Sequence, residues 1–201
     1  MIFLPSYEFL EWYKLDLTIR ADLVSVIENV RRGANIELWK LKNGLGGLRH
    51  FSEQKKYLEF CLKKFGLHYR DYMKNYYVSK ELTWLDKLWK KEIDCGEFLD
   101  YPRCCITAFE KGCREYNTRK ALGPAVEFSQ SLIQEKNVDE RLLWTLHIPC
   151  KLDCRETLKL AEKAKAVLLD KDVQAAEYLV SFNQNRVYQF YINFINPPKS
   201  R

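Results

Sequence analysis

The stretch His147-Ile148-Pro149-Cys150-Lys151-Leu152-Asp153-Cys154 organises our interpretation of this chain. A second stretch, Tyr101-Pro102-Arg103-Cys104-Cys105, complements it. Together the two stretches hold four of the seven cysteines and one of the three histidines. Each lies where the flanking residues predict the beginning of a helix. The sequence therefore indicates one site built where two helices start.

Helix-start signals accompany both stretches. Asp153 is a favourable N-cap residue, and Glu156 follows three positions later, as in a capping box. We therefore expect a helix over 154–169. A second helix is expected over 101–116, with Pro102 in its first turn, where a missing N–H costs nothing. The partial positive charge at a helix N-terminus favours the thiolate form of a nearby cysteine, which is the form that binds metal.

The candidate metal ligands are Cys104, Cys105, His147, Cys150 and Cys154. If the two helix starts meet, three cysteines and the histidine form a set that suits tetrahedral zinc. Three or four cysteines can equally hold an iron–sulfur cluster. Adjacent residues on a helix point roughly 100° apart, so one of Cys104 and Cys105 is favoured as a ligand over both. The spacing His-x2-Cys-x3-Cys matches neither a zinc ribbon nor a ferredoxin.

Other interpretations of the same cysteines stay open. Cys104 or Cys105 could form a disulfide with Cys150 or Cys154, and free cysteines also pack as small apolar residues. The chain could also be a metal-free thiol redox or sulfur-handling enzyme that uses these four thiols. Whether the protein is an enzyme at all is left open, because no other acid–base or nucleophile motif is present.

The two motifs also carry a resemblance. Tyr101-Pro102-x-Cys104-Cys105, with Phe109 following, and His147-x-Pro149-Cys150-x3-Cys154 resemble the signature of a family of uncharacterised, largely archaeal proteins, a domain of unknown function. The similarity covers residues 99–165. It implies that these cysteines and this histidine belong to one shared site, and it implies no activity.

Basic charge is concentrated in one part of the chain. Between Arg49 and Lys91 there are eleven Lys or Arg and five Asp or Glu, so this window carries the whole net charge of +6. Ten aromatic residues lie in the same window. Lysines meet phosphates and aromatic rings stack on bases, so an RNA-binding surface is possible here. The candidate contacts are Lys56, Lys63 and Lys64. The alternative is an ordinary solvated helix surface over a core of aromatic residues.

Composition sets broad limits. With 201 residues and 47% hydrophobic residues, the chain can bury a core of its own. No signal peptide and no apolar run of about 20 residues is present, so we expect a cytoplasmic protein with reduced thiols and no membrane partner. Its abundance of Lys and Glu is typical of thermophile proteins.

Helical periodicity dominates the chain. An amphipathic helix is expected over 52–65, and its predicted buried residues are Leu58, Cys61, Leu62 and Phe65. Helices are also expected over 69–78 and 81–93. The inward residues predicted for 81–93 are Leu82, Leu85, Leu88 and Trp89. A short stretch that favours β-structure, 36–42, could contribute to a small sheet.

The C-terminal part shows strand periodicity. Apolar and polar residues alternate over 188–194, and Asn183-Gln184-Asn185 suggests a turn. We therefore predict a β-hairpin over 178–195, although 173–182 also fits a helix. The predicted fold class is α+β and predominantly helical, with a helical N-terminal part, cysteine-bearing helices and a C-terminal hairpin. Residues 1–98 would form a helical, aromatic and basic region, and 99–201 a cysteine-motif region, with one continuous domain as the alternative.

Overall fold

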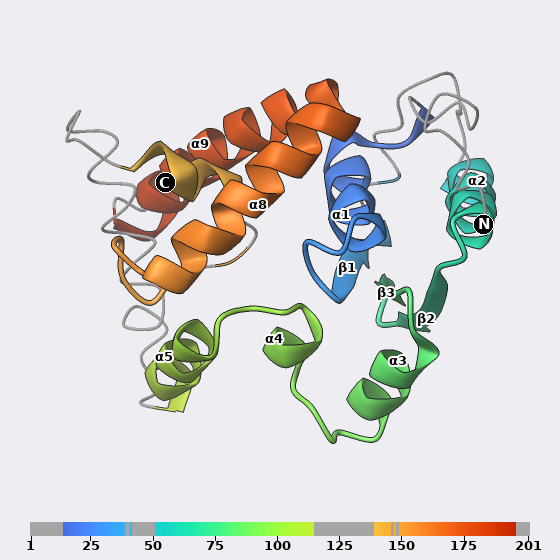
Figure 1. Cartoon of the computed structure of the whole chain (residues 1–201), viewed down its shortest axis with the longest axis horizontal. Helices are drawn as coiled ribbons and strands as arrows, with labels where there is room; N and C mark the ends of the chain where they lie inside the picture. The colour runs from blue at the N-terminus through green and yellow to red at the C-terminus, as the bar shows by residue number, and fades with distance from the viewer. Residues whose placement is uncertain are drawn as a thin grey trace, which may run out of the picture. The chain divides into compact units, whose positions relative to one another are not determined.

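The protein is a predominantly helical α+β structure with one small antiparallel sheet, as the sequence predicts (Figure 1). This computed structural model describes residues 14–38, 41, 51–114, 139–145, 147 and 149–195. The chain divides into two compact units. Unit 1 comprises Met1–Asp100 and Val167–Ala176, and unit 2 comprises Tyr101–Ala166 and Glu177–Arg201. The predicted boundary between two sequence regions near residue 98 stays a prediction.

Unit 1 is built around the sheet. Its elements are α1 (Leu17–Ile27), β1 (Gly33–Glu37), α2 (Phe51–Lys64), β2 (His68–Tyr72), β3 (Asn75–Ser79), α3 (Leu82–Trp89) and α4 (Cys95–Phe98). The strand order is β1-β3-β2, and both pairings are antiparallel. The strand predicted within 36–42 therefore exists but begins and ends earlier, and residues 39, 40 and 42 lie outside the described part.

The predicted amphipathic helix is confirmed as α2. Leu58, Cys61, Leu62 and Phe65 are all buried, because they recur at helical spacing on one side. The helix ends where Gly66 adopts a φ of 65°, and the N–H of Leu67 donates to the carbonyl of Leu62. This six-residue closing bond is the Schellman arrangement that glycine favours.

The helix predicted over 69–78 is wrong, because these residues form the β2–β3 hairpin. Tyr72 pairs with Asn75, which leaves a two-residue turn of Met73 and Lys74. Both turn residues have positive φ, 48° and 67°. A tight hairpin turn of this hand normally contains Asn or Gly. Tyrosine and valine favour strands, but the turn itself carries no recognisable sequence signal.

The helix predicted over 81–93 is shorter than expected. As α3 it ends at Trp89, and of its predicted inward residues only Leu85 is fully buried. Leu82 is 47% exposed and Trp89 is 38% exposed. The Trp89 ring instead lies edge-on to the rings of Tyr72 and Tyr77. The helix therefore buries Leu85 and places the Trp89 ring against two tyrosines of the sheet.

Unit 2 contains the cysteine-bearing helices. Its elements are α5 (Arg103–Arg114), the 3-10 helix η4 (Glu140–Trp144), and most of α8 (Arg155–Lys171) and α9 (Val173–Ile195). Asp139 caps η4 by accepting a hydrogen bond from the N–H of Arg141. Arg141 also reaches Glu162 of α8 at 2.6 Å, and Lys165 of α8 lies over the Trp144 ring. These contacts attach η4 to α8.

The predicted C-terminal hairpin is also wrong, because 173–195 form the single helix α9. Ala175, Ala176 and Leu179 are buried at helical spacing. No glycine or proline interrupts this segment, and an isolated hairpin is marginal in water. The predicted turn residue Asn183 instead donates from Nδ2 to the carbonyls of Leu143 and Thr145, at 2.6 and 3.0 Å.

Candidate metal centre

The start of α5 brings two adjacent cysteines into the site. The carbonyl of Pro102 accepts hydrogen bonds from the N–H groups of Cys105 and Ile106, at 2.8 and 3.1 Å. Pro102 therefore caps the helix just before its first turn, where its missing N–H has no cost. Cys105 is 3% exposed, whereas Cys104 is exposed. Phe109, one turn further on, is exposed as well.

The start of α8 supplies a further cysteine, and its cap differs from the prediction. The carbonyl of Cys154 accepts the N–H of Leu158 at 2.9 Å, which makes Cys154 the N-cap residue. The predicted cap, Asp153, is exposed and pairs with Lys151 at 3.2 Å. The Cys154 sulfur takes the place of the usual cap oxygen, since it accepts the backbone N–H of Thr157.

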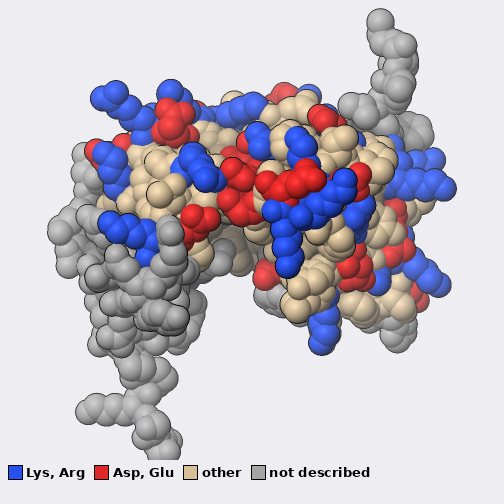
Figure 2. All heavy atoms as spheres, turned by 90° about the horizontal axis from the view of Figure 1, so that it is seen from below, with Lys and Arg blue, Asp and Glu red and all other residues tan. Residues whose placement is uncertain are grey.

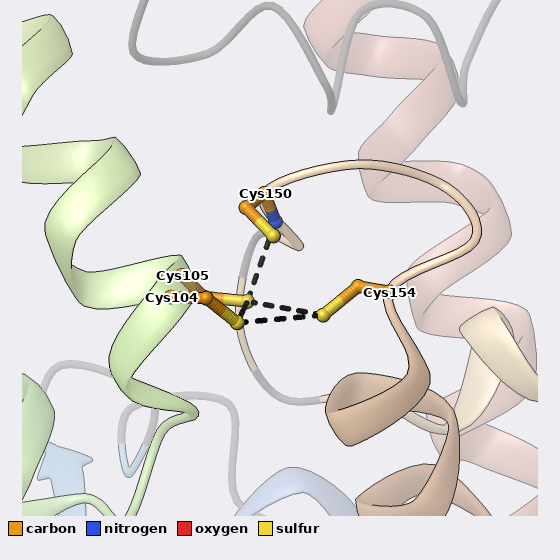
Figure 3. Close-up of side chains that lie close together, drawn as sticks. All are labelled: Cys104, Cys105, Cys150 and Cys154. Carbon is orange, nitrogen blue, oxygen red and sulfur yellow. Dashed lines mark hydrogen bonds between the residues drawn. The ribbon is translucent and has the colours of Figure 1, made fainter.

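Four sulfur atoms converge from these two helix starts and the loop that precedes α8 (Figure 3). The Sγ atom of Cys104 lies 3.9 Å from that of Cys105 and 3.6 Å from that of Cys154. Cys105 and Cys154 are 3.8 Å apart. All four Sγ atoms, including that of Cys150, lie within 4.8 Å of one another. Both adjacent cysteines therefore belong to the cluster, although the sequence favoured only one of them.

The cluster contains thiols and no disulfide. Every cysteine whose side chain the structure describes is free. The disulfide between the two motifs, which the sequence leaves open as an alternative, is thus absent from this conformation. Four thiols this close together form a donor set that can hold a metal ion.

The protein environment affects the thiols unequally. Burial raises the pKa of Cys105 to about 11, although Thr157 and the N–H of Cys150 donate to its sulfur. Burial and the neighbouring thiols also raise the pKa of Cys150. Burial opposes ionisation of Cys154, but hydrogen bonds from Thr157, Cys150 and Cys104 outweigh it and lower its pKa to about 7. Of these three thiols, Cys154 therefore loses its proton most readily, and the thiolate is the form that binds metal.

His147 lies beside the cluster but outside the group of four sulfur atoms. Its Nε2 atom is 3.0 Å from Oγ1 of Thr157, and its ring stacks on Tyr101 with centroids 4.9 Å apart. Oγ1 of Thr157 is in turn 3.3 Å from the Sγ atom of Cys105. His147 as a direct metal ligand stays a prediction. Sequence reasoning missed Thr157, although its position three residues after Cys154 places it in the first turn of α8.

The basic and aromatic region belongs to unit 1. Lys56, Lys63 and Lys64 are exposed on α2, and Lys64 lies over the ring of Phe60. Several other rings in this region are covered by cations of the chain itself. Arg32 and Lys87 both lie over Trp84, and Arg70 lies over Trp89. Figure 2 shows acidic and basic side chains intermixed on one face. An RNA-binding role for the three lysines stays a prediction.

None of the helices in the described part of the chain combines the length and the apolar character that a bilayer crossing requires.

Comparison with known proteins places the chain among uncharacterised relatives. A family described as "Protein of unknown function (DUF483)" matches residues 48–178. "Uncharacterized protein MJ1106" of Methanocaldococcus jannaschii is 34% identical to this chain over 82 residues. Those residues make up 41% of this chain and 43% of that relative, so the chain aligns with less than half of the relative's length. No solved structure matches the chain.

Proposed function

This chain belongs to the DUF483 family of unknown function, and we propose that it is a metal-binding protein whose four clustered cysteines hold one ion. Membership of this family, together with the archaeal relative, confirms the resemblance inferred from the sequence. Because the family description names no activity, the geometry of the thiols must carry the proposal. The proposed ligands are Cys104, Cys105, Cys150 and Cys154.

The convergence of the four sulfur atoms is the observation that supports the proposal best. A zinc–sulfur bond of about 2.3 Å places the corners of a regular tetrahedron about 3.8 Å apart. The three sulfur pairs among Cys104, Cys105 and Cys154 are 3.6, 3.8 and 3.9 Å apart. Sulfur atoms in van der Waals contact have a similar spacing, so the convergence of four thiols from three chain segments, and not the distance alone, carries the proposal.

The same spacing favours a single ion over a cluster. The four cysteines of an iron–sulfur cluster are divided among two or four iron atoms, so some of their sulfur atoms must lie further apart than ligands that share one ion. Here all four sulfur atoms lie within 4.8 Å of one another. Zinc and a single iron ion both accept four thiolates in a tetrahedron. We favour zinc because divalent zinc binds a given site more tightly than ferrous iron.

A structural role follows from the number of ligands. Four thiolates fill a tetrahedral ion, whereas a catalytic zinc keeps one position open for water or substrate. The ion would join the first turn of α5 to the N-cap of α8 and the loop before it, across sequence separations of 45 to 50 residues. Both helix N-termini would stabilise the negative thiolates. We place this protein in a reducing, cytoplasmic setting, where such thiols remain available.

Metal analysis tests the proposal directly. The protein is purified without oxygen, and zinc, iron and acid-labile sulfide are measured per chain. We expect one zinc ion per chain, lost in a Cys150→Ser, Cys154→Ser double variant. Cys95→Ser is the matched control, because Cys95 is an exposed cysteine outside the cluster. That control variant should keep its metal.

Other results would change the assignment. Iron with sulfide would mean an iron–sulfur cluster and would contradict the single-ion geometry. A stable, metal-free protein would contradict metal binding altogether. A metal-free protein in which Cys104 and Cys154 form a reversible disulfide would favour the thiol-enzyme alternative, which the 3.6 Å separation of their sulfur atoms makes geometrically accessible. Cys104 is the exposed member of that pair.

A further inference from the structure

We propose that Thr157 and His147 position the Cys105 ligand through a hydrogen-bond relay, in which the Thr157 hydroxyl touches the sulfur and His147 acts through that hydroxyl. This inference rests on the proposed metal site and extends it to residues that are not ligands. It also assigns His147 a role outside the set of ligands, two hydrogen bonds away from the Cys105 sulfur.

Thr157 is placed to serve two ligands at once. It lies in the first turn of α8 and is 0% exposed. Its backbone N–H donates to the Cys154 sulfur, and its Oγ1 atom lies 3.3 Å from the Cys105 sulfur. The side chain and the backbone of one residue therefore contact ligands from both helices. A valine at this position would keep the backbone contact and remove only the hydroxyl.

The Thr157 hydroxyl has a single hydrogen to donate, and this fixes which group donates at each step of the relay. A metal-bound thiolate has no proton, so the Cys105 sulfur can only accept, and the single hydroxyl hydrogen of Thr157 must point to it. Oγ1 of Thr157 is then an acceptor toward Nε2 of His147, 3.0 Å away. In this relay His147 therefore carries a hydrogen on Nε2, and that N–H donates a hydrogen bond to the Thr157 hydroxyl oxygen. The relay runs from His147 through Thr157 to Cys105.

Two further contacts hold the relay in place. The Tyr101 ring stacks on the His147 ring at an interplanar angle of 28°, which restrains the plane of the imidazole. The backbone N–H of Cys150 also donates to the Cys105 sulfur, at 3.3 Å. Cys105 thus receives a hydroxyl and a backbone donor, and it is buried. Outer hydrogen bonds of this kind orient ligands and adjust how strongly they bind the metal.

Two pairs of variants separate the relay from general packing. Thr157→Val removes the hydroxyl, whereas Thr157→Ser keeps it. His147→Phe keeps an aromatic ring against Tyr101 but removes the donor, whereas His147→Gln keeps an N–H near the same place. Zinc affinity is measured for each full-length variant by competition with a chromophoric chelator. The cobalt-substituted proteins are compared by visible and near-ultraviolet absorption.

The relay predicts a specific pattern of results. Thr157→Val and His147→Phe should each weaken zinc binding about 10- to 100-fold, a range typical of lost outer-shell partners. The Thr157→Val, His147→Phe double variant should bind no more weakly than either single variant, because both act on one path. Thr157→Ser and His147→Gln should retain most of the affinity. The sulfur-to-cobalt absorption of His147→Phe should still report four thiolates.

Several results would overturn the relay. Unchanged affinity in Thr157→Val would do so, as would equal weakness of Thr157→Ser and Thr157→Val. A change of cobalt coordination in His147→Phe would mean that His147 binds the metal directly. If Thr157→Val does not fold, the two His147 variants decide the question alone. A wild-type protein that binds no metal overturns the proposed function together with the relay, whereas equal binding by all variants overturns the relay only.

Discussion

Two polar groups bring distant segments of this chain together, and they differ in whether the group contains both signs of charge. In unit 1, Arg20 of α1 makes two hydrogen bonds to Asp172, Nε to Oδ2 at 2.7 Å and Nη2 to Oδ1 at 2.5 Å. Asp172 also accepts the N–H of Ala175 and so caps α9. In unit 2, sulfur atoms from α5, α8 and the preceding loop meet one another. The first group contains both charges of an ion pair. The described atoms of the second group are thiol sulfurs, which are ligands for a cation.

The two groups need different charge partners in order to be stable. A buried carboxylate is tolerated when a guanidinium neutralises it and fills its hydrogen-bonding positions. The described contacts of the four sulfur atoms are with other sulfurs, the Thr157 hydroxyl and backbone N–H groups. Such partners can support one thiolate, but a set of thiolates needs a positive ion. We therefore expect unit 2, and not unit 1, to depend on metal.

Removing the metal should produce the largest effect and tests this contrast. A chelator should accelerate amide hydrogen exchange in α5 and in the first turns of α8, while β3 keeps its protection. The binding free energy of structural zinc in small peptides, about 10–16 kcal/mol, sets the upper limit of the stabilisation lost. Equal acceleration of amide exchange in both units, or no acceleration in either, would contradict the expectation that only unit 2 depends on metal. The Cys150→Ser, Cys154→Ser variant should not respond to chelator.

Breaking the ion pair between Arg20 and Asp172 in unit 1 should have the second-largest effect on stability. Asp172→Ala leaves the buried Arg20 guanidinium without its carboxylate, with only the neutral Gln174 oxygen 3.3 Å away, so the free energy of unfolding should fall by about 3–5 kcal/mol in denaturant titrations. Adding Arg20→Met should recover part of that loss, because an apolar side chain needs no partner. A double variant that is no more stable than Asp172→Ala would show that the cap of α9, rather than the charge pair, carries the stability.

A neutral contact in unit 2 offers an intermediate case. Asn183→Ala removes two hydrogen bonds to the carbonyls of Leu143 and Thr145. Alanine favours helix, so the expected loss of about 1–3 kcal/mol comes from the two carbonyls that lose their partner. The loss should appear in the metal-loaded protein. If metal alone stabilises unit 2, the variant will unfold at the same denaturant concentration as the wild type.

The smallest effect is expected at the surface ion pair between Arg141 and Glu162. Their side chains are 39% and 56% exposed, and the nitrogen–oxygen distance is 2.6 Å. Solvent screening and the entropy lost by two long side chains leave such pairs with little net stabilisation. Glu162→Gln should therefore change thermal stability only slightly, and less still at high salt. A loss as large as that of Asp172→Ala would mean that burial does not separate the two kinds of pair.

Local periodicity was a sufficient guide to some elements and insufficient for others. It located α2 and its buried face because one helix side is continuously apolar. It failed at the β2–β3 hairpin because Met73 and Lys74 adopt left-handed conformations without a glycine or asparagine signal. It failed again at α9, because the alternation of apolar and polar residues over 188–194 predicted a strand. The segment contains no glycine or proline, and it forms a helix.

The site shows a similar division. Motif spacing was enough to select the four cysteines that the fold brings together. It could not reveal that Cys154, and not Asp153, caps α8, because both residues precede the helix in sequence. Nor could it reveal Thr157, whose contacts with Cys105 and His147 arise only once three chain segments have met. Residues outside the binding motif become visible through tertiary contacts alone.

The most direct test of the central claim is X-ray absorption at the metal edge of the purified, metal-loaded protein. A single ion held by Cys104, Cys105, Cys150 and Cys154 predicts one shell of four sulfur atoms at about 2.3 Å, with no second metal nearby. A shell that includes nitrogen or oxygen would contradict the four-cysteine set. Scattering from a second metal atom would contradict the single ion.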